Sequence, residues 1–372
     1  QAHGLAGWVR NLAGEVEIHA QGEPRALTRF GAALIAEAPP LARPVIGCQE
    51  HAALQALAGF AILASSASAR MQAHLPPDAF VCDDCLRELA DPRDRRYRYP
   101  FINCTQCGPR YTLITRLPYD RAYTAMAGFP LCPACRTEYE NPGDRRFHAE
   151  PLACPVCGPQ LQFNSDEAGI IDDTAQALDA CVAALRAGLI VAVKGVGGYH
   201  LLCDARHDTA IARLRRLKPR PHKPLAVMFP FAGEDGLELV RSAAIVDRDS
   251  AELLLDAARP IVLLEKRTPF PLSTLLAPDL NELGVFLPYS PLHALLLNDF
   301  GAPLVATSAN ISGEPVLTDN HEAETRLAAV ADAFLHHDRP IVRPADDSVY
   351  RAIARRPRPL RLGRGVAPLE LD

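Results

Sequence analysis

Eight of the eleven cysteines in this chain fall into four C-x-x-C pairs at regular intervals. Two thiolates three residues apart, when they meet a second such pair, supply the four sulfur ligands of a tetrahedral zinc site. The spacing therefore predicts two structural zinc sites whose coordination is closed to substrate. The pairs are Cys82/Cys85, Cys104/Cys107, Cys132/Cys135 and Cys154/Cys157.

The segments that carry these pairs form an internal duplication. CDDCLRELADPRDRRYRYPFINCTQCGP and CPACRTEYENPGDRRFHAEPLACPVCGP share both cysteine pairs and a Pro-x-Asp-Arg-Arg-aromatic core. A unit with its own four ligands can duplicate as a whole, so we favour one zinc per unit, although a crossed pairing stays open. His148 aligns with Arg98, which cannot bind a metal, so His148 is not expected to be a ligand. The metal-type spacing and the length of the chain argue against a disulfide framework.

Three further polar clusters follow apolar runs in the second half of the chain. Lys194 opens the glycine-rich segment KGVGGYH, whose backbone N–H groups can approach an anion closely. Lys218, Arg220 and Lys223 lie within six residues, and the intervening prolines hold them in a stiff segment that suits a polyphosphate. Each cluster alone could equally be a turn or a solvated charge run. The third cluster offers small hydroxyl and amide groups to phosphate oxygens, from Thr307, Ser308 and Asn310.

Alternating helices and strands are expected to position these clusters. Their apolar periodicity indicates an α/β domain with a twisted, largely buried sheet, whose strand order the sequence does not give. Asp208 is expected to cap the helix that begins at this residue and ends at residue 217. The predicted helices span 173–187, 208–217 and 291–297, and the predicted strands span 189–193, 225–229, 261–264 and 303–307.

The composition argues against several classes of function. The net charge of -5 does not suit a generally cationic nucleic-acid binder. No run approaches the roughly 18–20 apolar residues that cross a membrane. We expect a cytoplasmic protein with reduced thiols, in which Cys48, Cys181 and Cys203 are buried apolar side chains. The arginines between residues 93 and 98 are expected to pair with nearby aspartates and loops rather than with RNA.

The polar clusters together resemble the YrdC family, whose members make acyl adenylates from ATP and a carbamate. The family pattern is Lys-x-Arg, then a Lys, then a distant Ser-x-Asn, which falls here on Lys218, Arg220, Lys223, Ser308 and Asn310. The resemblance implies that ATP with Mg²⁺ binds to these residues. Further nucleotide contacts are expected from Thr307, Ser348 and Arg364.

The order of the parts resembles the hydrogenase maturation factors HypF, which are carbamoyltransferases. RRYRYPFINCTQCGPRYT and FPLCPAC carry this likeness, together with the cysteine spacing ahead of a YrdC-like domain. Near the N-terminus, GWVRN resembles the G-W-V-x-N segment of acylphosphatases and would make Asn11 the residue that positions an attacking water. The acylphosphatase phosphate loop and its Arg would precede this segment, and a further domain would follow the YrdC-like one in the family. We therefore expect the chain to be a fragment.

The sequence thus predicts a multidomain fold with α/β and α+β parts. Residues 1–45 would form the C-terminal part of an acylphosphatase-like α+β unit, with a strand at 15–20 and a helix at 26–37. Residues 46–74 would be a connector, and 75–163 a tandem zinc-finger region with two four-cysteine units. A YrdC-like α/β domain would occupy 170–368.

The family resemblance implies a two-step reaction. Carbamoyl phosphate would be hydrolysed to carbamate, which would attack the α-phosphorus of ATP and form carbamoyl-AMP with release of pyrophosphate. Lys218, Arg220 and Lys223 would bind the phosphates, and Lys194 would face the carbamate. No general base is needed because carbamate is already a nucleophile, so His200 need not be catalytic. The carbamoyl group would pass to the partner HypE, which requires the further C-terminal domain.

Three alternatives stay open. A threonylcarbamoyl-AMP synthase for tRNA modification would share the YrdC-like site without needing the zinc cysteines. A zinc-dependent docking module would use the YrdC-like domain only to bind RNA. A carbamoyltransferase of small-molecule biosynthesis would share the architecture but use a different acceptor.

Overall fold

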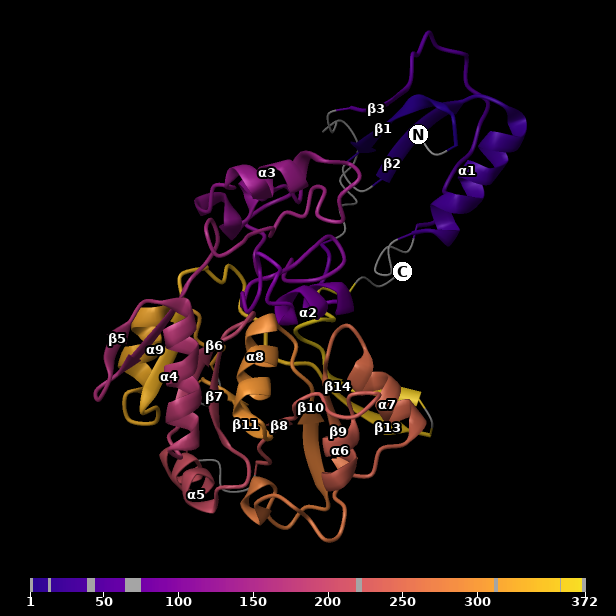
Figure 1. The fold of residues 1–372 in the computed structure, drawn as a ribbon. Coiled ribbons are helices and arrows are strands. Elements are labelled where there is room, and N and C mark those ends of the chain that lie inside the picture. Colours follow the sequence, from indigo (N-terminus) through magenta and orange to yellow (C-terminus); the bar gives the residue numbers. More distant parts are fainter. Residues whose placement is uncertain are drawn as a thin grey trace. The chain divides into compact units, whose positions relative to one another are not determined.

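The structure is a computed structural model that describes residues 3–12, 15–38, 44–63, 75–218, 223–310, 314–354 and 356–369, without the side chain of Asn11. The chain divides into two compact units, Gln1–Leu75 and Pro76–Asp372. Figure 1 labels helices and strands of each unit.

The first unit is a three-stranded sheet with one helix. β1 (Ala6–Leu12) pairs antiparallel with β2 (Glu15–Gln21) and parallel with β3 (Phe60–Ile62). Gly7 permits this close pairing, because a Cβ there would lie 2.0 Å from the carbonyl oxygen of His19. α1 (Pro24–Ala36) begins with a proline, whose fixed φ suits the first turn of a helix. The predicted strand and helix are confirmed, and the segment predicted as a connector contributes β3.

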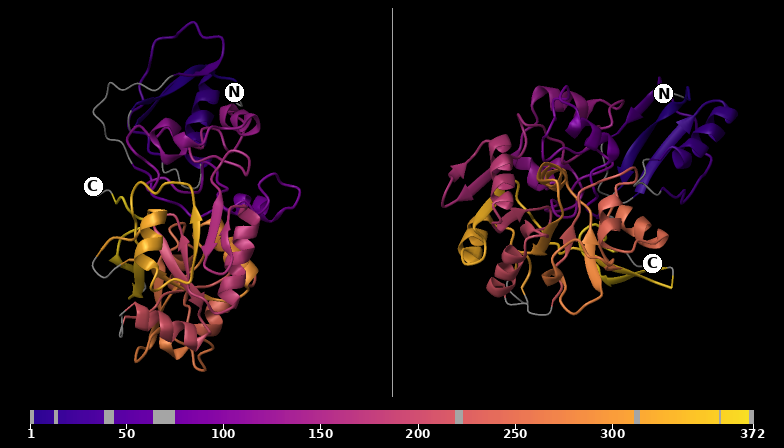
Figure 2. Two further views of the ribbon diagram at one scale, coloured as in Figure 1. Left: turned by 90° about the vertical axis from the view of Figure 1, so that its left-hand side faces the viewer. Right: turned by 60° about the horizontal axis from the view of Figure 1, so that its bottom comes forward.

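The second unit contains an 11-stranded mixed sheet in the order β14-β13-β9-β10-β8-β11-β7-β6-β12-β4-β5. The pairs β8/β10, β6/β12 and β9/β13 are parallel, and the others are antiparallel. The two edge strands lie on opposite sides of the unit (Figures 1 and 2). The strands are β4 (Leu161–Ser165), β5 (Gly169–Ile171), β6 (Val191–Lys194), β7 (Tyr199–Asp204), β8 (Val227–Met228), β9 (Ile261–Glu265), β10 (Glu282–Phe286), β11 (Leu304–Ser308), β12 (Ala333–His337), β13 (Val349–Ile353) and β14 (Arg356–Arg361).

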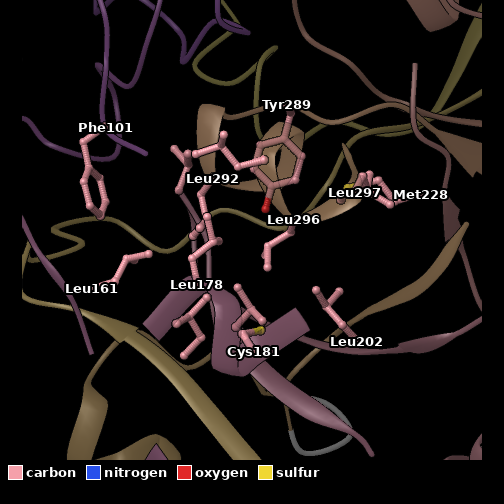
Figure 3. Packing of buried hydrophobic residues seen from close by; sticks show 14 of the residues in the cluster. Phe101, Leu161, Leu178, Cys181, Leu202, Met228, Tyr289, Leu292, Leu296 and Leu297 are labelled. Carbon is pink, nitrogen blue, oxygen red and sulfur yellow. The ribbon is translucent and has the colours of Figure 1, made fainter. Parts of the chain in front are cut away.

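Helices cover both faces of this sheet. Successive strand residues point to opposite faces, so Val191 and Val193 of β6 join one hydrophobic cluster and Ala192 joins the other. The first cluster contains the apolar sides of α4 (Thr174–Arg186) and α8 (Pro291–Phe300), and Figure 3 shows Leu178 and Leu292 among its members. The second cluster contains residues of α5 (Asp208–Leu217), α6 (Glu238–Ala243), α7 (Arg248–Leu255) and α9 (Asn320–Leu327).

The zinc-finger region packs onto the α/β part of the same unit. It contains α2 (Asp83–Ala90), α3 (Pro133–Glu140) and two short 3-10 helices, η1 (Arg121–Tyr123) and η2 (Ala125–Gly128). The two repeated segments, residues 82–109 and 132–159, are the first and second cysteine units. Phe101 and Ile102 of the first cysteine unit belong to the cluster that contains α4 and α8. Arg98 donates two hydrogen bonds to Asp299 of α8, at 3.0 and 2.6 Å. The first cysteine unit and the sheet therefore share one hydrophobic core.

Most predicted elements of the α/β part are confirmed, with shifted ends. Asp173 caps α4 by accepting a hydrogen bond from the backbone N–H of Gln176 at 2.9 Å. The predicted capping by Asp208 is wrong, because the N-cap is His207 and Asp208 lies in the first turn. The predicted strand at 225–229 shortens to β8. Within the described residues, no helix has the length and apolar character that a membrane span requires.

The three remaining cysteines differ in exposure. Cys181 and Cys203 are buried in the core, as predicted. The prediction that Cys48 is buried is wrong, because it lies exposed in a segment without helix or strand.

Candidate active site

The eight paired cysteines form two separate sulfur clusters. Within each cluster, the four sulfur atoms all lie within 4.8 Å of one another. The favoured pairing, one cluster for each repeated unit, is therefore the one that the structure contains. His148 belongs to neither cluster and packs instead against Tyr139 and Phe147. The clusters are Cys82, Cys85, Cys104 and Cys107, and Cys132, Cys135, Cys154 and Cys157.

The spacing of the sulfur atoms fits zinc. Neighbouring sulfurs are 3.6 to 3.8 Å apart. A tetrahedron with zinc–sulfur bonds of about 2.3 Å places its sulfurs roughly 3.8 Å apart, whereas a disulfide requires about 2.05 Å. Four sulfur ligands leave no open position for a substrate, so these clusters suit structural metal sites.

The two cysteine units are joined by reciprocal ion pairs. Glu138 of the second unit accepts hydrogen bonds from Arg95 and Arg96 of the first, at 2.6 and 2.5 Å. At the equivalent positions of the repeat, Glu88 of the first unit pairs with Arg145 and Arg146 of the second. The arginines between residues 93 and 98 were expected to pair with nearby aspartates and loops. Arg93 pairs with Asp91 as predicted, whereas Arg98 pairs with the distant Asp299.

The same arginines also contact the zinc ligands of the opposite unit. Arg95 and Arg96 donate to the sulfur of Cys135, at 3.3 and 3.4 Å. Arg145 donates to the sulfur of Cys85 at 3.3 Å. Four thiolates around one Zn²⁺ carry a net charge of about −2, which these guanidinium groups partly neutralise.

The predicted polar clusters of the α/β part meet at one edge of the sheet. In four neighbouring strands, β11, β7, β6 and β12, the facing ends carry Ser308, His200, Lys194 and His337. The glycine-rich segment after Lys194 is the hairpin between β6 and β7, closed by a hydrogen bond from the Gly195 N–H to the Gly198 carbonyl at 2.8 Å. A Cβ on Gly195 would lie 2.5 Å from the hydroxyl of Tyr289, which explains the glycine.

Three residues of the predicted phosphate site converge at this edge. Lys218, directly after α5, donates from Nζ to the carbonyl of Ser308 and to Oδ1 of Asn310, the latter at 3.2 Å. The Ser308 hydroxyl donates to the same Oδ1 at 3.0 Å. Lys223 is exposed, and Thr307 is buried on the opposite face of β11 from Ser308. Lys218, Ser308 and Asn310 thus form a contiguous group of hydrogen-bonding side chains.

Lys194 is buried where β6 ends. Its Nζ donates to Oδ1 of Asn320 at 2.6 Å and to the carbonyl of His337 at 3.1 Å, both neutral acceptors. Burial, together with the positive charge of Arg339, lowers the pKa of Lys194 to about 8. The lysine can therefore hold an anion when protonated, and it loses its charge readily above that pH.

Ser348 and Arg364 have internal partners in the structure. Arg364 donates to Oδ1 of Asp347 and to two backbone carbonyls, and its guanidinium lies 3.5 Å from the ring centre of Tyr289. The Ser348 hydroxyl donates to the Arg364 carbonyl at 3.0 Å. Burial alone would raise the pKa of Asp347, but Arg364 and His200 outweigh it and lower that pKa well below its ordinary value. Nucleotide contacts from Ser348 and Arg364 stay a prediction.

Two predicted site residues have side chains that lie outside the described part of the structure. Arg220, together with His222, lies outside the described residues, between α5 and Lys223. Asn11 lies on β1 opposite Val16, but its side chain is outside the description.

Arg339, a buried arginine two residues after β12, belongs to none of the polar clusters predicted from the sequence. The available signal was an Arg-Pro step directly after an apolar strand, which ordinarily indicates only a turn.

Comparison with family models divides the chain into three types of domain. The acylphosphatase model matches residues 1–61. The HypF finger model matches twice, at 81–114 and 131–163. The Sua5_yciO_yrdC model, described as telomere recombination, matches 183–363.

Similarity to individual proteins extends over nearly the whole chain. The carbamoyltransferase HypF of Synechocystis sp. is 48% identical over 368 residues, which are 99% of this chain and 47% of that protein. A crystal structure of full-length HypF in the phosphate- and nucleotide-bound form matches with a TM-score of 0.90 and 43% identity, over 99% of this chain and 47% of that one. The threonylcarbamoyl-AMP synthase of Stenotrophomonas maltophilia is 32% identical over 162 residues, or 42% of this chain and 84% of that protein.

These similarities agree with the architecture and with the two sulfur clusters. The chain spans about half the length of the curated HypF relatives that it matches. It belongs to the HypF family of carbamoyltransferases.

Proposed function

We propose that this chain joins carbamate to the α-phosphorus of ATP and so makes carbamoyl-AMP. A carbamate oxygen forms the new bond to the α-phosphorus, the bond to the β-phosphate bridge breaks, and pyrophosphate leaves. The observation that carries the proposal is the group formed by Lys218, Ser308 and Asn310, which brings a cation, a hydroxyl and an amide from separate elements to one edge of the sheet.

The residues at this edge of the sheet suit a reaction in which a nucleophile attacks the α-phosphorus of ATP and pyrophosphate leaves. Such a reaction requires little covalent help from the protein, but it requires neutralised charge and in-line alignment. Lys218, Arg220 and Lys223 would neutralise the polyphosphate, whose Mg²⁺ the nucleotide brings with it. Ser308 and Asn310 would orient the phosphates by hydrogen bonds. A HypF relative was crystallised with phosphate and nucleotide bound, which supports a nucleotide site in this family.

The remaining steps of the family reaction are also proposals for this chain. The acylphosphatase-like unit would take part in hydrolysing carbamoyl phosphate to carbamate, with Asn11 positioning the water. The carbamoyl group would pass from carbamoyl-AMP to the partner HypE. The zinc sites would have a structural role in holding the cysteine units against the sheet.

Pyrophosphate release from ATP tests the adenylation. The chain would receive carbamate formed from ammonia and bicarbonate, then carbamoyl phosphate, then threonine with bicarbonate. We expect release with supplied carbamate. Release only with threonine would identify a threonylcarbamoyl-AMP synthase, the activity of the partial relative from Stenotrophomonas maltophilia. If no substrate supports release while the zinc is bound and the fold is intact, a docking role becomes the better account.

A further inference from the structure

The two cysteine units contact each other through equivalent residues of the repeat. Arg96 of the first unit donates from Nε to the carbonyl of Ala153 at 2.8 Å. Its counterpart Arg146 donates from Nε to the carbonyl of Asn103 at 3.1 Å, and Asn103 is the counterpart of Ala153. Each of these arginines also pairs with a glutamate of the opposite unit. An interface in which both sides offer the same residues is that of a symmetric dimer, built here within one chain.

This interface reaches the predicted zinc ligands on both sides. The sulfur of Cys135 accepts hydrogen bonds from Arg95 and Arg96. The sulfur of its counterpart, Cys85, accepts one from Arg145. Each sulfur cluster therefore receives guanidinium groups from the unit that does not hold that metal. Contacts to a ligand atom tune the affinity of a metal site, so the affinity of either site should depend on the folding of the opposite unit.

The second unit has a much smaller apolar core than the first. The first unit shares the large hydrophobic cluster of the sheet. The second unit has a separate cluster, and two of its four buried members are themselves predicted zinc ligands. So small a core does not offset the conformational entropy that the unit loses on folding, so its order should depend on zinc. The buried members are Cys135, Ala149, Leu152 and Cys154.

We propose that the arginines of this interface couple the two metal sites, so that zinc in one unit raises the affinity of the other unit for zinc. Zinc that orders the second unit brings Arg145 to Cys85. Zinc that orders the first unit brings Arg95 and Arg96 to Cys135. A coupling free energy between two sites is the same in both directions. Loss of a contact to a metal ligand typically reduces affinity by about 10- to 100-fold, which sets the expected size of the coupling.

Repulsion between the two metal centres acts against this coupling. Each zinc tetrathiolate carries a net charge of about −2. The interface pairs four arginines with two glutamates, and this excess of positive charge reduces the repulsion. We therefore expect the ordering of the opposite unit to decide the sign of the coupling.

Native mass spectrometry of the full chain, reduced and freed of metal and then given one equivalent of zinc, measures the coupling. With the expected coupling, chains that carry one zinc should make up about a tenth to a quarter of the total, and the rest should carry none or two. Equal and independent sites would leave about half of the chains with one zinc, and unequal independent sites would leave more. A singly loaded share of half or more would overturn the proposal.

Alkylation of the cysteines tests whether the arginines carry the coupling. Arg145 belongs to the second unit, yet Arg145→Met should weaken the first site by about 10-fold. With a limiting amount of chelator, iodoacetamide should then react faster with the four cysteines of the first unit. Arg95→Met should act in the same way on the cysteines of the second unit. Peptide mapping by mass spectrometry identifies the cysteines that react.

The chosen variants keep the buried part of the interface. Arg95 and Arg145 are partly exposed, whereas the more deeply buried Arg96 and Arg146 remain, so the units should stay in contact. Arg93→Met is the control and should react like the wild type, because Arg93 pairs with Asp91 of its own unit. If each variant first exposes the cysteines of its own unit, the arginines have only a local structural role and the proposal fails. The proposal also fails if neither variant raises the share of singly loaded chains.

Discussion

Lys194 is a charged side chain that lies buried at the end of β6. Burial lowers its pKa from the ordinary 10.5 to about 8 because water no longer stabilises the ammonium form. In the unfolded chain the same lysine keeps its proton up to higher pH. Between about pH 8 and 10.5 the unfolded chain therefore binds a proton that the folded chain has released, and folding becomes more favourable as the pH rises.

The Lys194→Met variant tests this difference. We expect the free energy of unfolding of the wild type, measured relative to the variant, to increase between pH 7.5 and 9.5 by on the order of 2 kcal/mol. Urea denaturation of both proteins at the two pH values gives the comparison, and other titrating groups cancel between them. A difference that does not change with pH would mean that the lysine is hydrated in the folded protein.

Three residues that a sequence motif singles out lie together in the structure. Lys218, Ser308 and Asn310 were assigned from a motif, and their side chains meet although the lysine is about ninety residues away in the chain. Arg339 gives no such signal, because its burial beside Phe101 depends on what the folded chain places around it. The internal contacts of Arg364 were equally invisible, since they involve backbone carbonyls from another segment.

The two cysteine units behave as a pair of linked elements. The side chain of Arg96 is 1% exposed, and it bonds Glu138, the sulfur of Cys135 and the carbonyl of Ala153. All three partners belong to the second unit, whereas Arg96 itself belongs to the first. Loss of this side chain therefore removes contacts to a metal ligand and leaves Glu138 with one cation fewer.

We expect Arg96→Met to weaken both the fold and the second zinc site. Breaking a buried ion pair costs roughly 3 kcal/mol, and loss of a contact to a zinc ligand typically reduces metal affinity by about 10- to 100-fold. Zinc release to a coloured chelator, followed by absorbance, measures the affinity. Arg93→Met is the matched control, because the exposed Arg93 pairs with Asp91 at the surface and its loss should leave stability nearly unchanged. Equal zinc release from both variants would contradict the linkage.

The pairing of the cysteines shows what a repeat can predict about elements. Each repeated segment carries four ligands, so the duplication alone favours one metal per unit, and the structure contains one sulfur cluster in each unit. The ion pairs between the units could not be predicted, because Arg95 and Glu138 come together only when the two copies pack. The order of the strands in the sheet could not be predicted from the sequence either, because short strands such as β5 and β8 have too few residues to show an apolar periodicity.

In the whole molecule, the first sulfur cluster and the sheet belong to one hydrophobic core, whereas the second sulfur cluster has a small core of its own. Phe101 and Leu89 of the first cysteine unit pack in the same cluster as Leu178 and Leu292 of the α/β part. Loss of zinc should therefore destabilise the packing of α4 and α8 on the sheet as well as the cysteine units. The residues of the Gln1–Leu75 unit include no member of either sulfur cluster.

Removal of zinc should consequently act on one unit more than on the other. After chelation we expect faster hydrogen exchange in α4 and α8 as well as in the cysteine units, with exchange in β1 and β2 unchanged. Hydrogen exchange with mass spectrometry, before and after addition of the chelator and again after zinc is restored, measures each segment. Unchanged protection of α4 and α8 would show that the sheet is independent of the metal sites.

Isotope labelling can show whether carbamate attacks the α-phosphorus of ATP at this sheet edge. Carbamate prepared from ¹⁸O-labelled carbon dioxide and ammonia would be mixed with ATP and the chain in unlabelled water. The mass of the nucleotide product would then be measured by mass spectrometry. We expect AMP that carries one ¹⁸O atom, because the bridging oxygen of carbamoyl-AMP stays on phosphorus when the carbamoyl group leaves. Unlabelled AMP, or ADP as the nucleotide product, would show that carbamate does not attack the α-phosphorus.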